Sequence, residues 1–206
     1  PAADVNFTGA GGKVYQFHIS EGPVATRVFP AAVPMDGKGS VTLAGPGVKA
    51  GTKVEVVATP LVGESDRGEV VVKEAPLPLE VVRARYPVVE ALGATMEAPV
   101  VVTAPCVVAS RIPAAGKEAA FKLVMKKGER LQARFWSRSI GLGVEGNLTV
   151  HNPAGERMAA NANPSDVFTE PTLAWSAPVD GDYTVRVGDL FGRCAEGSDF
   201  VLEIAP

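Results

Sequence analysis

Histidine and cysteine, on which many catalytic and metal sites depend, are scarce: the 206 residues include two of each. His18 and His151 lie in different halves of the chain, each in a strand-like run, and no HExxH pair occurs. Zinc sites place such side chains at set spacings. The sequence therefore disfavours a histidine metal centre. Because a GxSxG motif is also missing, it equally disfavours a serine or cysteine hydrolase.

Long apolar runs and clusters of basic charge are missing as well. No run reaches the roughly 18–20 apolar residues that a membrane-spanning helix needs. The formal net charge is −3, and lysine and arginine are spread along the chain rather than gathered in one stripe. We therefore expect no membrane span in this chain and no nucleic-acid partner.

The two cysteines, Cys106 and Cys194, show no CxxC spacing and no neighbouring histidine, so a metal site built on them is not expected. Two interpretations stay open. In the first, they form one disulfide that closes a long loop, which in the chain-entropy model contributes about 4–5 kcal/mol. In the second, they are separate buried thiols, a common state of free cysteine.

Valine and alanine supply much of the apolar content, and 22 glycines and 17 prolines are scattered between short alternating runs. Valine fits pleated strands, while glycine, proline and aspartate supply turns. With no helical period anywhere, this pattern predicts an all-β fold. In the first half we expect strands at 13–19, 25–29, 40–45, 53–62, 69–74 and 79–85.

Four prolines between residues 74 and 99 make that stretch a poor strand and a worse helix. We therefore expect a linker over 86–98 between a first domain, 1–85, and a second domain, 99–206. The second domain contains eight strand-like runs, enough for a sandwich of jelly-roll size. These runs are 106–112, 119–126, 130–138, 147–152, 156–161, 172–178, 182–189 and 199–204.

Asp180 and Asp182, in "APVDGDYTVRV", are the sharpest candidates for a chemically active carboxylate pair. Such a pair could supply two of the six to eight oxygens that calcium requires. However, Asp-Gly is also a favoured hairpin turn, and an alternating run follows. We interpret the pair as the turn into a strand. A less favoured hypothesis is an enzyme whose acidic site is assembled from Glu145, Glu170 and Asp180.

The order of motifs in the second half resembles the bacterial pre-peptidase C-terminal domain family over about 96–206. "VTAPCVVASRI" is similar to the first strand of that family. The later motifs are "GKEAAFKLVMKKGERLQARFWSRSIG", "GNLTVHNPAGERMAANAN" and "TLAWSAPVDGDYTVRVGDLFG" with a final "SDFVLEI". The resemblance implies a small jelly-roll-type sandwich. It also implies a non-catalytic appendage of secreted proteins that assists secretion or binds substrate, collagen or polysaccharide, in some members with calcium.

The sequence departs from this family pattern where calcium would bind. Many members carry an acidic stretch before the first strand, whereas 90–99 has only Glu90 and Glu97. At a position where many members have carboxylates, Lys117 and Ala119 stand instead. Because calcium requires several anionic oxygens, we expect no calcium and no other cofactor. Two further elements of the pattern are also depleted in acids, at 144–146 and 161–163.

The first half resembles, over "SVTLAGPGVKAGTKVEVVATPLV", the immunoglobulin-like repeats of large bacterial surface proteins. Taken together, the two halves predict an all-β protein of two β-sandwich domains. The N-terminal domain is immunoglobulin-like, and the C-terminal domain is a jelly-roll-type, pre-peptidase-like sandwich.

These features favour a non-catalytic accessory or binding module pair of a larger secreted or cell-surface bacterial protein. Its expected partners are adjacent domains and an extracellular protein or polysaccharide, in an extracytoplasmic location. The alternative is a carbohydrate-binding module, since exposed aromatic rings stack on sugars. Trp136 is the candidate for such stacking because it neighbours the inward-facing Phe135 and therefore points outward. Trp175 shares a side with Leu173 and is expected in the core.

Overall fold

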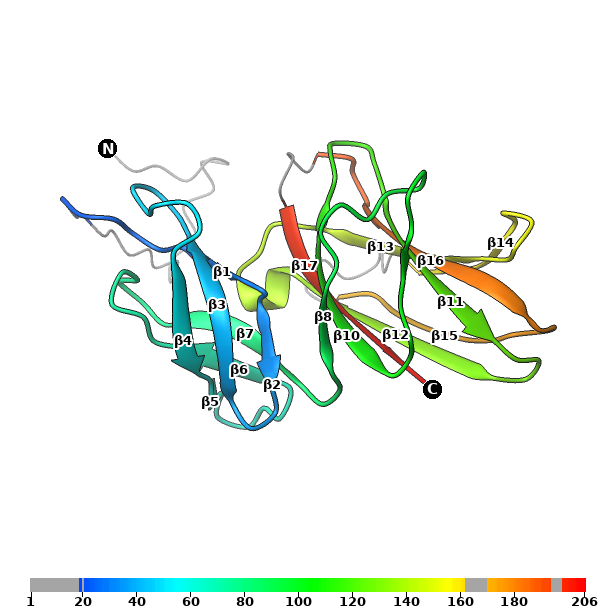
Figure 1. Cartoon of the computed structure of the whole chain (residues 1–206), viewed down its shortest axis with the longest axis horizontal. Helices are drawn as coiled ribbons and strands as arrows, with labels where there is room; N and C mark the ends of the chain where they lie inside the picture. The colour runs from blue at the N-terminus through cyan, green and yellow to red at the C-terminus, as the bar shows by residue number, and fades with distance from the viewer. Residues whose placement is uncertain (1–18, 20, 162–169, 194–197) are drawn as a thin grey trace, which may run out of the picture.

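The computed structural model of the chain describes residues 19, 21–161, 170–193 and 198–206. Nearly all of its regular structure is β-strand, arranged in four sheets that form two sandwiches lying side by side (Figure 1). The predicted all-β fold is confirmed. In the described part of the chain, no helix is long and apolar enough to cross a membrane.

The N-terminal sandwich is built from a three-stranded sheet, β1-β3-β4, and a four-stranded sheet, β2-β7-β6-β5. Small branched side chains fill its core, including Val28, Leu43, Val70 and Val81, each at most 2% exposed. Its strands are β1 (Arg27–Phe29), β2 (Ala32–Pro34), β3 (Lys38–Ala44), β4 (Lys53–Val57), β5 (Thr59–Pro60), β6 (Arg67–Val70) and β7 (Leu79–Ala84).

The C-terminal sandwich packs two five-stranded sheets, which we call the inner sheet, β15-β12-β17-β10-β8, and the outer sheet, β14-β13-β16-β11-β9. The inner sheet lies toward the N-terminal sandwich (Figure 1). The strands are β8 (Val88–Glu90), β9 (Val100–Val101), β10 (Cys106–Ile112), β11 (Ala119–Met125), β12 (Arg130–Trp136), β13 (Gly146–His151), β14 (Arg157–Asn161), β15 (Thr172–Ser176), β16 (Gly181–Asp189) and β17 (Ser198–Ala205).

Alternation along the strands builds the core between these two sheets. In β12, Leu131, Ala133 and Phe135 point inward and are at most 2% exposed. Gln132 and Arg134, between them, are exposed, whereas Trp136 at the end of the strand is buried on the other face. The "KKGE" stretch turns the chain from β11 into β12, as expected of a glycine between two strand-like runs. Gly128 makes that turn with φ of 84°, a backbone conformation that costs glycine little.

The eight strands predicted for the second half are all present, with ends within two residues of the prediction. The first half agrees less well. The run 53–62 is divided between β4 and β5, and the short β2 was not expected. The strand expected at 13–19 lies outside the described residues except at Ile19.

The expected linker, 86–98, contributes to the C-terminal sandwich. Val88–Glu90 forms β8, which pairs in parallel with Val107–Ala109 of β10. Pro87 does not oppose this pairing: it is a strand-edge residue whose carbonyl accepts the N–H of Val107, 2.9 Å away. The glycine-rich segment 137–146 forms no α-helix, but Arg138–Ile140 makes one turn of 3₁₀ helix, η1.

Candidate functional site at the junction of the sandwiches

The surface of the inner sheet that faces away from its own core is apolar and covered. Alternation turns Val107, Trp136 and Val201 to that side, and pairing places Trp136 directly opposite Val201. All three are at most 2% exposed, because they form one cluster with residues of the N-terminal sandwich. We call this set the junction cluster: Ala31, Ala32, Val82, Ala84, Val107, Trp136, Ile140 and Val201.

Trp136 does not stack on sugars in this structure. Alternation correctly sends it to the face opposite Phe135, but the N-terminal sandwich covers that face and leaves the indole 2% exposed. The guanidinium of Arg134 lies 4.6 Å from the centre of a Trp136 ring, in the geometry of a cation–π contact. The exposed position that ligand stacking by Trp136 requires is therefore not found, and the indole packs between the two domains instead.

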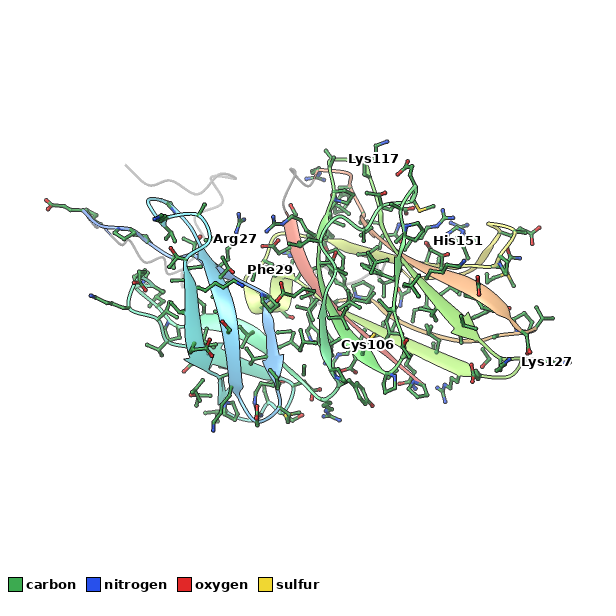
Figure 2. All side chains as sticks on the ribbon, in the orientation of Figure 1. Arg27, Phe29, Cys106, Lys117, Lys127 and His151 are labelled. Carbon is green, nitrogen blue, oxygen red and sulfur yellow. The ribbon has the colours of Figure 1, made fainter. Side chains whose placement is uncertain are left out.

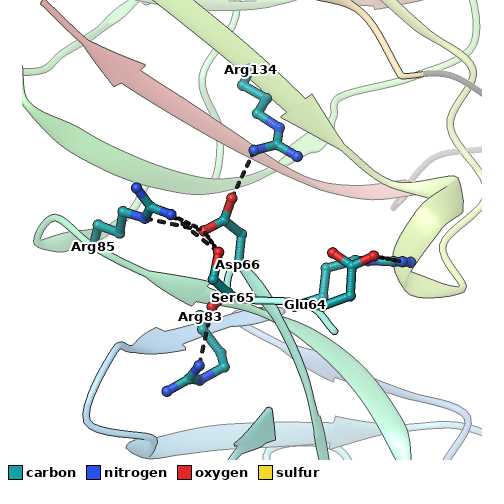
Figure 3. Close-up of polar contacts among 7 residues, drawn as sticks. Glu64, Ser65, Asp66, Arg83, Arg85 and Arg134 are labelled. Carbon is teal, nitrogen blue, oxygen red and sulfur yellow. Dashed lines mark hydrogen bonds and ion pairs between the residues drawn. The ribbon is translucent and has the colours of Figure 1, made fainter. Parts of the chain in front are cut away.

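Asp66 connects the two sandwiches at one side of the junction cluster. Its Oδ1 accepts hydrogen bonds from Arg85 Nη2, at 2.6 Å, and from the Ser65 hydroxyl, at 2.9 Å. Its Oδ2 accepts one from Arg134 Nη1, at 2.9 Å, across the junction. Figure 3 shows this carboxylate between the two guanidinium groups. Such charge-assisted bonds are stronger than neutral ones.

Arg67 makes a second connection. Its Nη1 donates to the carbonyl oxygen of Ser139 in η1, at 2.8 Å, and its Nη2 donates to Glu64 Oε1, at 2.9 Å. The Glu170 carboxylate accepts hydrogen bonds from the Ser137 N–H and the Ser139 hydroxyl. Glu170 therefore holds the turn whose carbonyl receives Arg67.

Asp199 forms a third connection and is a buried carboxylate, 3% exposed. Arg111 Nε, from the neighbouring strand β10, donates to its Oδ1 at 2.6 Å. Arg27 Nε, from the N-terminal sandwich, lies 3.8 Å from its Oδ2. The Arg111 guanidinium also lies 5.6 Å from the ring centre of Phe29. Figure 2 shows Arg27 and Phe29 on the side of the N-terminal sandwich that faces its neighbour.

The junction shifts the pKa values of two carboxyl groups in opposite directions. Partial burial acts to raise the pKa of Asp66, but the hydrogen bonds from Ser65, Arg85 and Arg134 outweigh burial and hold that pKa below its ordinary value. For Glu203, burial dominates over the attraction of Arg134 and raises the pKa. The ionised form of Asp66 is therefore stabilised by the fold, and that of Glu203 is disfavoured.

A separate cleft of about 420 Å³ lies at one end of the C-terminal sandwich. It brings together two of the segments in which the family resemblance implied carboxylates, since Glu97 and Lys117 both line it. The pKa of Glu97 is lowered by its own backbone N–H, by Thr95 and by the positive charge of Lys117. The positive charge of Lys117 thus already stabilises the ionised carboxylate of Glu97.

The other two acids that line this cleft also have partners. Glu118 Oε2 lies 3.9 Å from Arg186 Nη1. Asp189 accepts the backbone N–H of Glu145 at 3.1 Å and that of Arg193 at 2.6 Å. In residues 21–161, 170–193 and 198–206, no three His, Cys, Asp or Glu side chains gather in a way that could hold a metal ion.

Asp180 and Asp182 serve the turn and the strand that follows it. Asp180 Oδ1 accepts the backbone N–H of Lys127 at 2.7 Å, and this bond lowers its pKa. Asp182 Oδ2 lies 2.6 Å from Lys122 Nζ on the adjacent strand β11. Asp180 precedes β16 and Asp182 lies within it, as the turn interpretation predicts.

The acidic site considered at Glu145, Glu170 and Asp180 is not assembled. Glu145 pairs with Arg138 at 2.5 Å, and Glu170 binds the turn that follows β12. Asp180 binds Lys127, before β12 begins. The seven residues of β12 separate these two places, a length of about 20 Å. Figure 2 shows Lys127 at the end of the sandwich remote from Lys117.

The histidines and cysteines supply no visible reactive pair among the described residues. His151 is buried, at 8% exposed, and its ring nitrogens contact the Gly155 carbonyl at 3.0 Å and the Thr149 hydroxyl at 3.1 Å. Cys106 is a free, buried thiol whose pKa is raised by burial to about 11. His18 and Cys194 lie outside the described residues.

The residues that join the sandwiches were not identified from sequence, although one signal for them exists. Continuous apolar runs at Val107–Ala109 and at Phe200–Leu202 indicate strands that are buried on both faces. In a sandwich whose sheets each have one face in solvent, apolar and polar residues would alternate at these positions. The partners of Asp66 and Asp199 across the junction, Arg134 and Arg27, carry no such signal, because they come from distant parts of the chain.

Comparison with known proteins places the chain in no family: no protein-family model matches, and no curated protein matches. Among solved structures, a periplasmic inhibitor of g-type lysozyme from Aeromonas hydrophila, PliG, is 14% identical, with a TM-score of 0.39, over 57% of this chain and 98% of its own. The pre-peptidase C-terminal domain of a Bacillus anthracis collagenase is 6% identical, with a TM-score of 0.35, over 59% and 98%. TM-scores this low assign no function.

Proposed function

We propose that this chain is a non-catalytic pair of β-sandwiches that acts as one rigid accessory and binding unit of a larger secreted or cell-surface bacterial protein. The ordered motifs of 96–206 support a pre-peptidase-like identity for the second sandwich. The first sandwich then serves as an immunoglobulin-like support. The unit presents its binding surface at a fixed angle to the neighbouring domains of the polypeptide.

The observation that carries this proposal is the junction. An apolar centre around Trp136 is bordered by charged contacts at Asp66 and Asp199, which is how stable protein interfaces are built. Flexibly linked domains bury little of each other's surface. Here the charged side chains that border the apolar centre of the junction hold the two domains together. Domains held in a fixed arrangement are suited to presenting a binding surface to a partner.

The partners proposed are an extracellular protein or polysaccharide and the adjacent domains of the parent protein, in an extracytoplasmic location. No nucleic acid is proposed as a partner. No calcium requirement is proposed, because Lys117 and Arg186 already act on Glu97 and Glu118, the acids nearest the expected site. Isothermal titration of EDTA-treated protein with calcium is expected to show no micromolar site.

The direct test is binding by the whole chain to insoluble extracellular matrices: collagen, peptidoglycan and cellulose. Retention on at least one matrix, with no release of soluble peptide or sugar, supports a non-catalytic binding unit. Release of fragments in proportion to protein concentration would contradict it. Small-angle scattering of the same protein tests rigidity, since a freely jointed pair would give a broader distance distribution than the structure.

A further inference from the structure

One aromatic side chain of the C-terminal sandwich is open to solvent. Phe191 follows β16 and is 54% exposed, whereas every other aromatic residue that the structure describes is buried or half-buried. A single exposed apolar side chain is common on protein surfaces. Phe191 is distinguished by the turn that carries it, by a charged group on its ring and by a hollow beside it.

The turn that carries the ring is held by hydrogen bonds at both of its ends. Asp189 Oδ2 accepts the N–H of Arg193 at 2.6 Å, and its Oδ1 accepts the N–H of Glu145 at 3.1 Å. The Leu190 N–H donates to the carbonyl of Glu145 at 2.7 Å. One carboxylate therefore closes the turn and fastens it to the residue before β13. Loops that rest on a rigid scaffold in this way commonly carry binding residues.

The guanidinium of Arg193 lies over the Phe191 ring, 4.4 Å from its centre. This is the geometry of a cation–π contact. The ring is 54% exposed with the guanidinium in place, so surface remains on which a ligand can stack. Because the contact orders both side chains before a ligand arrives, less conformational entropy is lost when it binds.

A hollow of about 440 Å³ lies beside the ring. Ligand sites commonly have volumes of about 300–1,000 Å³. Two arginines and two acids line the hollow, so their formal charges cancel: Arg138, Arg193, Glu145 and Asp189. Glu145 pairs with Arg138 at 2.5 Å and uses for this one of the about four acceptor sites of a carboxylate. The hollow thus offers hydrogen-bonding groups without a net charge.

These features favour a neutral sugar over a charged polymer or an extended peptide. An aromatic ring stacks on the apolar C–H face of a sugar, and polar side chains beside it, Glu145 among them, can bond to the hydroxyl groups. Balanced charge gives no advantage to an acidic or a basic polymer. An extended peptide would need backbone groups to pair with, but the N–H groups of Leu190 and Arg193 are bonded within the protein.

We propose that Phe191 and the hollow beside it bind a neutral polysaccharide, with the ring stacked on one sugar unit and Glu145 bonded to its hydroxyl groups. The site lies at the turn that follows β16, and not at Trp136, the aromatic residue that the sequence singles out. This inference rests on the proposed binding function and identifies its surface and its partner class.

The test is isothermal titration of the full chain with neutral hexasaccharides of glucose, mannose, xylose and N-acetylglucosamine. Saturable binding of at least one of them is expected. Hexagalacturonate, an acidic sugar of the same length, should bind more weakly by about fivefold or more. Absence of binding by all four neutral sugars, or equal binding of the acidic one, would overturn the proposal.

Variants of Phe191 locate the site. Phe191→Ala removes the stacking surface and is expected to weaken binding about tenfold. Phe191→Tyr keeps the ring and should bind within about twofold of wild type. Leu77→Ala is the matched control, because Leu77 is similarly exposed, at 51%, in the segment before β7, and it should leave binding unchanged. Equal binding by Phe191→Ala and wild type would contradict the proposal.

Backbone amide chemical shifts give a second readout that needs no variant. In the native chain, a bound hexasaccharide should shift the amide signals of Leu190 and Arg193 and leave those of β4 unchanged. Saturable binding without shifts in this turn would place the sugar elsewhere and overturn the assignment.

Three outcomes separate this site from the proposed function. If the chain is retained on collagen but binds no neutral hexasaccharide, the binding function stands and the sugar site is wrong. If the sugars bind at Phe191 and soluble fragments are released, the site stands and the non-catalytic function fails. If neither a matrix nor a sugar binds, both proposals fail.

Discussion

The two outward surfaces of the C-terminal sandwich follow the same strand alternation, but the N-terminal sandwich covers one of them and the other is open to solvent. On the inner sheet the outward residues include Val107, Trp136 and Val201, all buried against the N-terminal sandwich. On the outer sheet they include Lys122 and Asp182, paired with each other and open to solvent. The difference shows that periodicity tells which side chains leave a core, but not whether a second domain then covers them.

The largest expected effect comes from breaking the covered surface. Trp136→Ala removes a buried indole from the junction cluster, and we expect the free energy of unfolding to fall by about 3–5 kcal/mol. Urea denaturation followed by circular dichroism measures this. Lys122→Ala, on the open surface, is the control and should change stability by less than about 0.5 kcal/mol. Similar small effects of both variants would show that the two surfaces do not differ.

The next effect tests the core that lies between those surfaces. A methyl group added at Gly146 would lie 2.6 Å from ring carbons of Phe135. Overpacking of this kind costs about 1–3 kcal/mol, so Gly146→Ala should lower the thermal midpoint. Gly143→Ala is the matched control, since nothing lies within 4 Å of its added methyl group. A stabilised Gly146→Ala variant would contradict the packing described.

Asp66 tests the charged border of the covered surface. Asp66→Asn is expected to cost about 1–2 kcal/mol at neutral pH, because Arg85 and Arg134 lose a shared carboxylate. The folded-state pKa of Asp66 is lowered, so its contribution is present above its unfolded pKa and is lost as pH falls through the folded pKa. Wild type and variant should therefore converge in stability as the pH falls through this lowered pKa, as measured by urea titrations at several acidic pH values.

Glu203 sharpens the same comparison with the opposite sign. Burial raises the pKa of its carboxyl, so ionisation at neutral pH acts against folding. This penalty decreases as pH falls through the folded pKa and is gone below the unfolded pKa. Glu203→Gln should therefore raise the unfolding free energy at pH 7 by a few tenths of a kcal/mol. The gain should vanish in acid. A loss of stability at pH 7 would mean that attraction to Arg134 outweighs burial.

The smallest expected effect is that of a reductant. Cys106 is free on the inward side of β10, so we expect dithiothreitol to leave the unfolding midpoint unchanged. Alkylation of the native chain should also be slow, because burial raises the pKa of this thiol to about 11 and keeps it protonated at neutral pH. A midpoint that falls on reduction would favour the bridge to Cys194, and peptide mapping would identify it.

Local pattern predicted the strands of the second half because runs such as β12 and β16 alternate and turn residues separate the runs. The "KKGE" turn and the strand after Asp180 are examples. Prediction failed where pairing partners decide structure. Val88–Glu90 became a strand because β10 offers it a free edge, despite the prolines around it. No local feature of that segment encodes the edge.

The candidate site residues also divide into those whose role follows from local sequence and those whose role depends on distant neighbours. The turn role of Asp180 was predictable, because the Asp-Gly pair and the alternating run that follows it are local features of the sequence. The burial of Trp136 was not, because the residues of the N-terminal sandwich that cover it, from Ala31 to Ala84, are more than fifty positions away in the sequence. Asp66 and Arg134 likewise meet across 68 positions. Contacts of this range depend on how the domains dock.

By itself, the sequence determined that this protein is all-β, where most of its strands lie, and which side of each strand is apolar, because these properties follow from side-chain alternation and turn chemistry. The tertiary structure alone decided which outward surface is covered, and that Trp136 packs between the two domains. The physical reason is that burial and pairing depend on neighbours distant in the chain, and no local pattern specifies them.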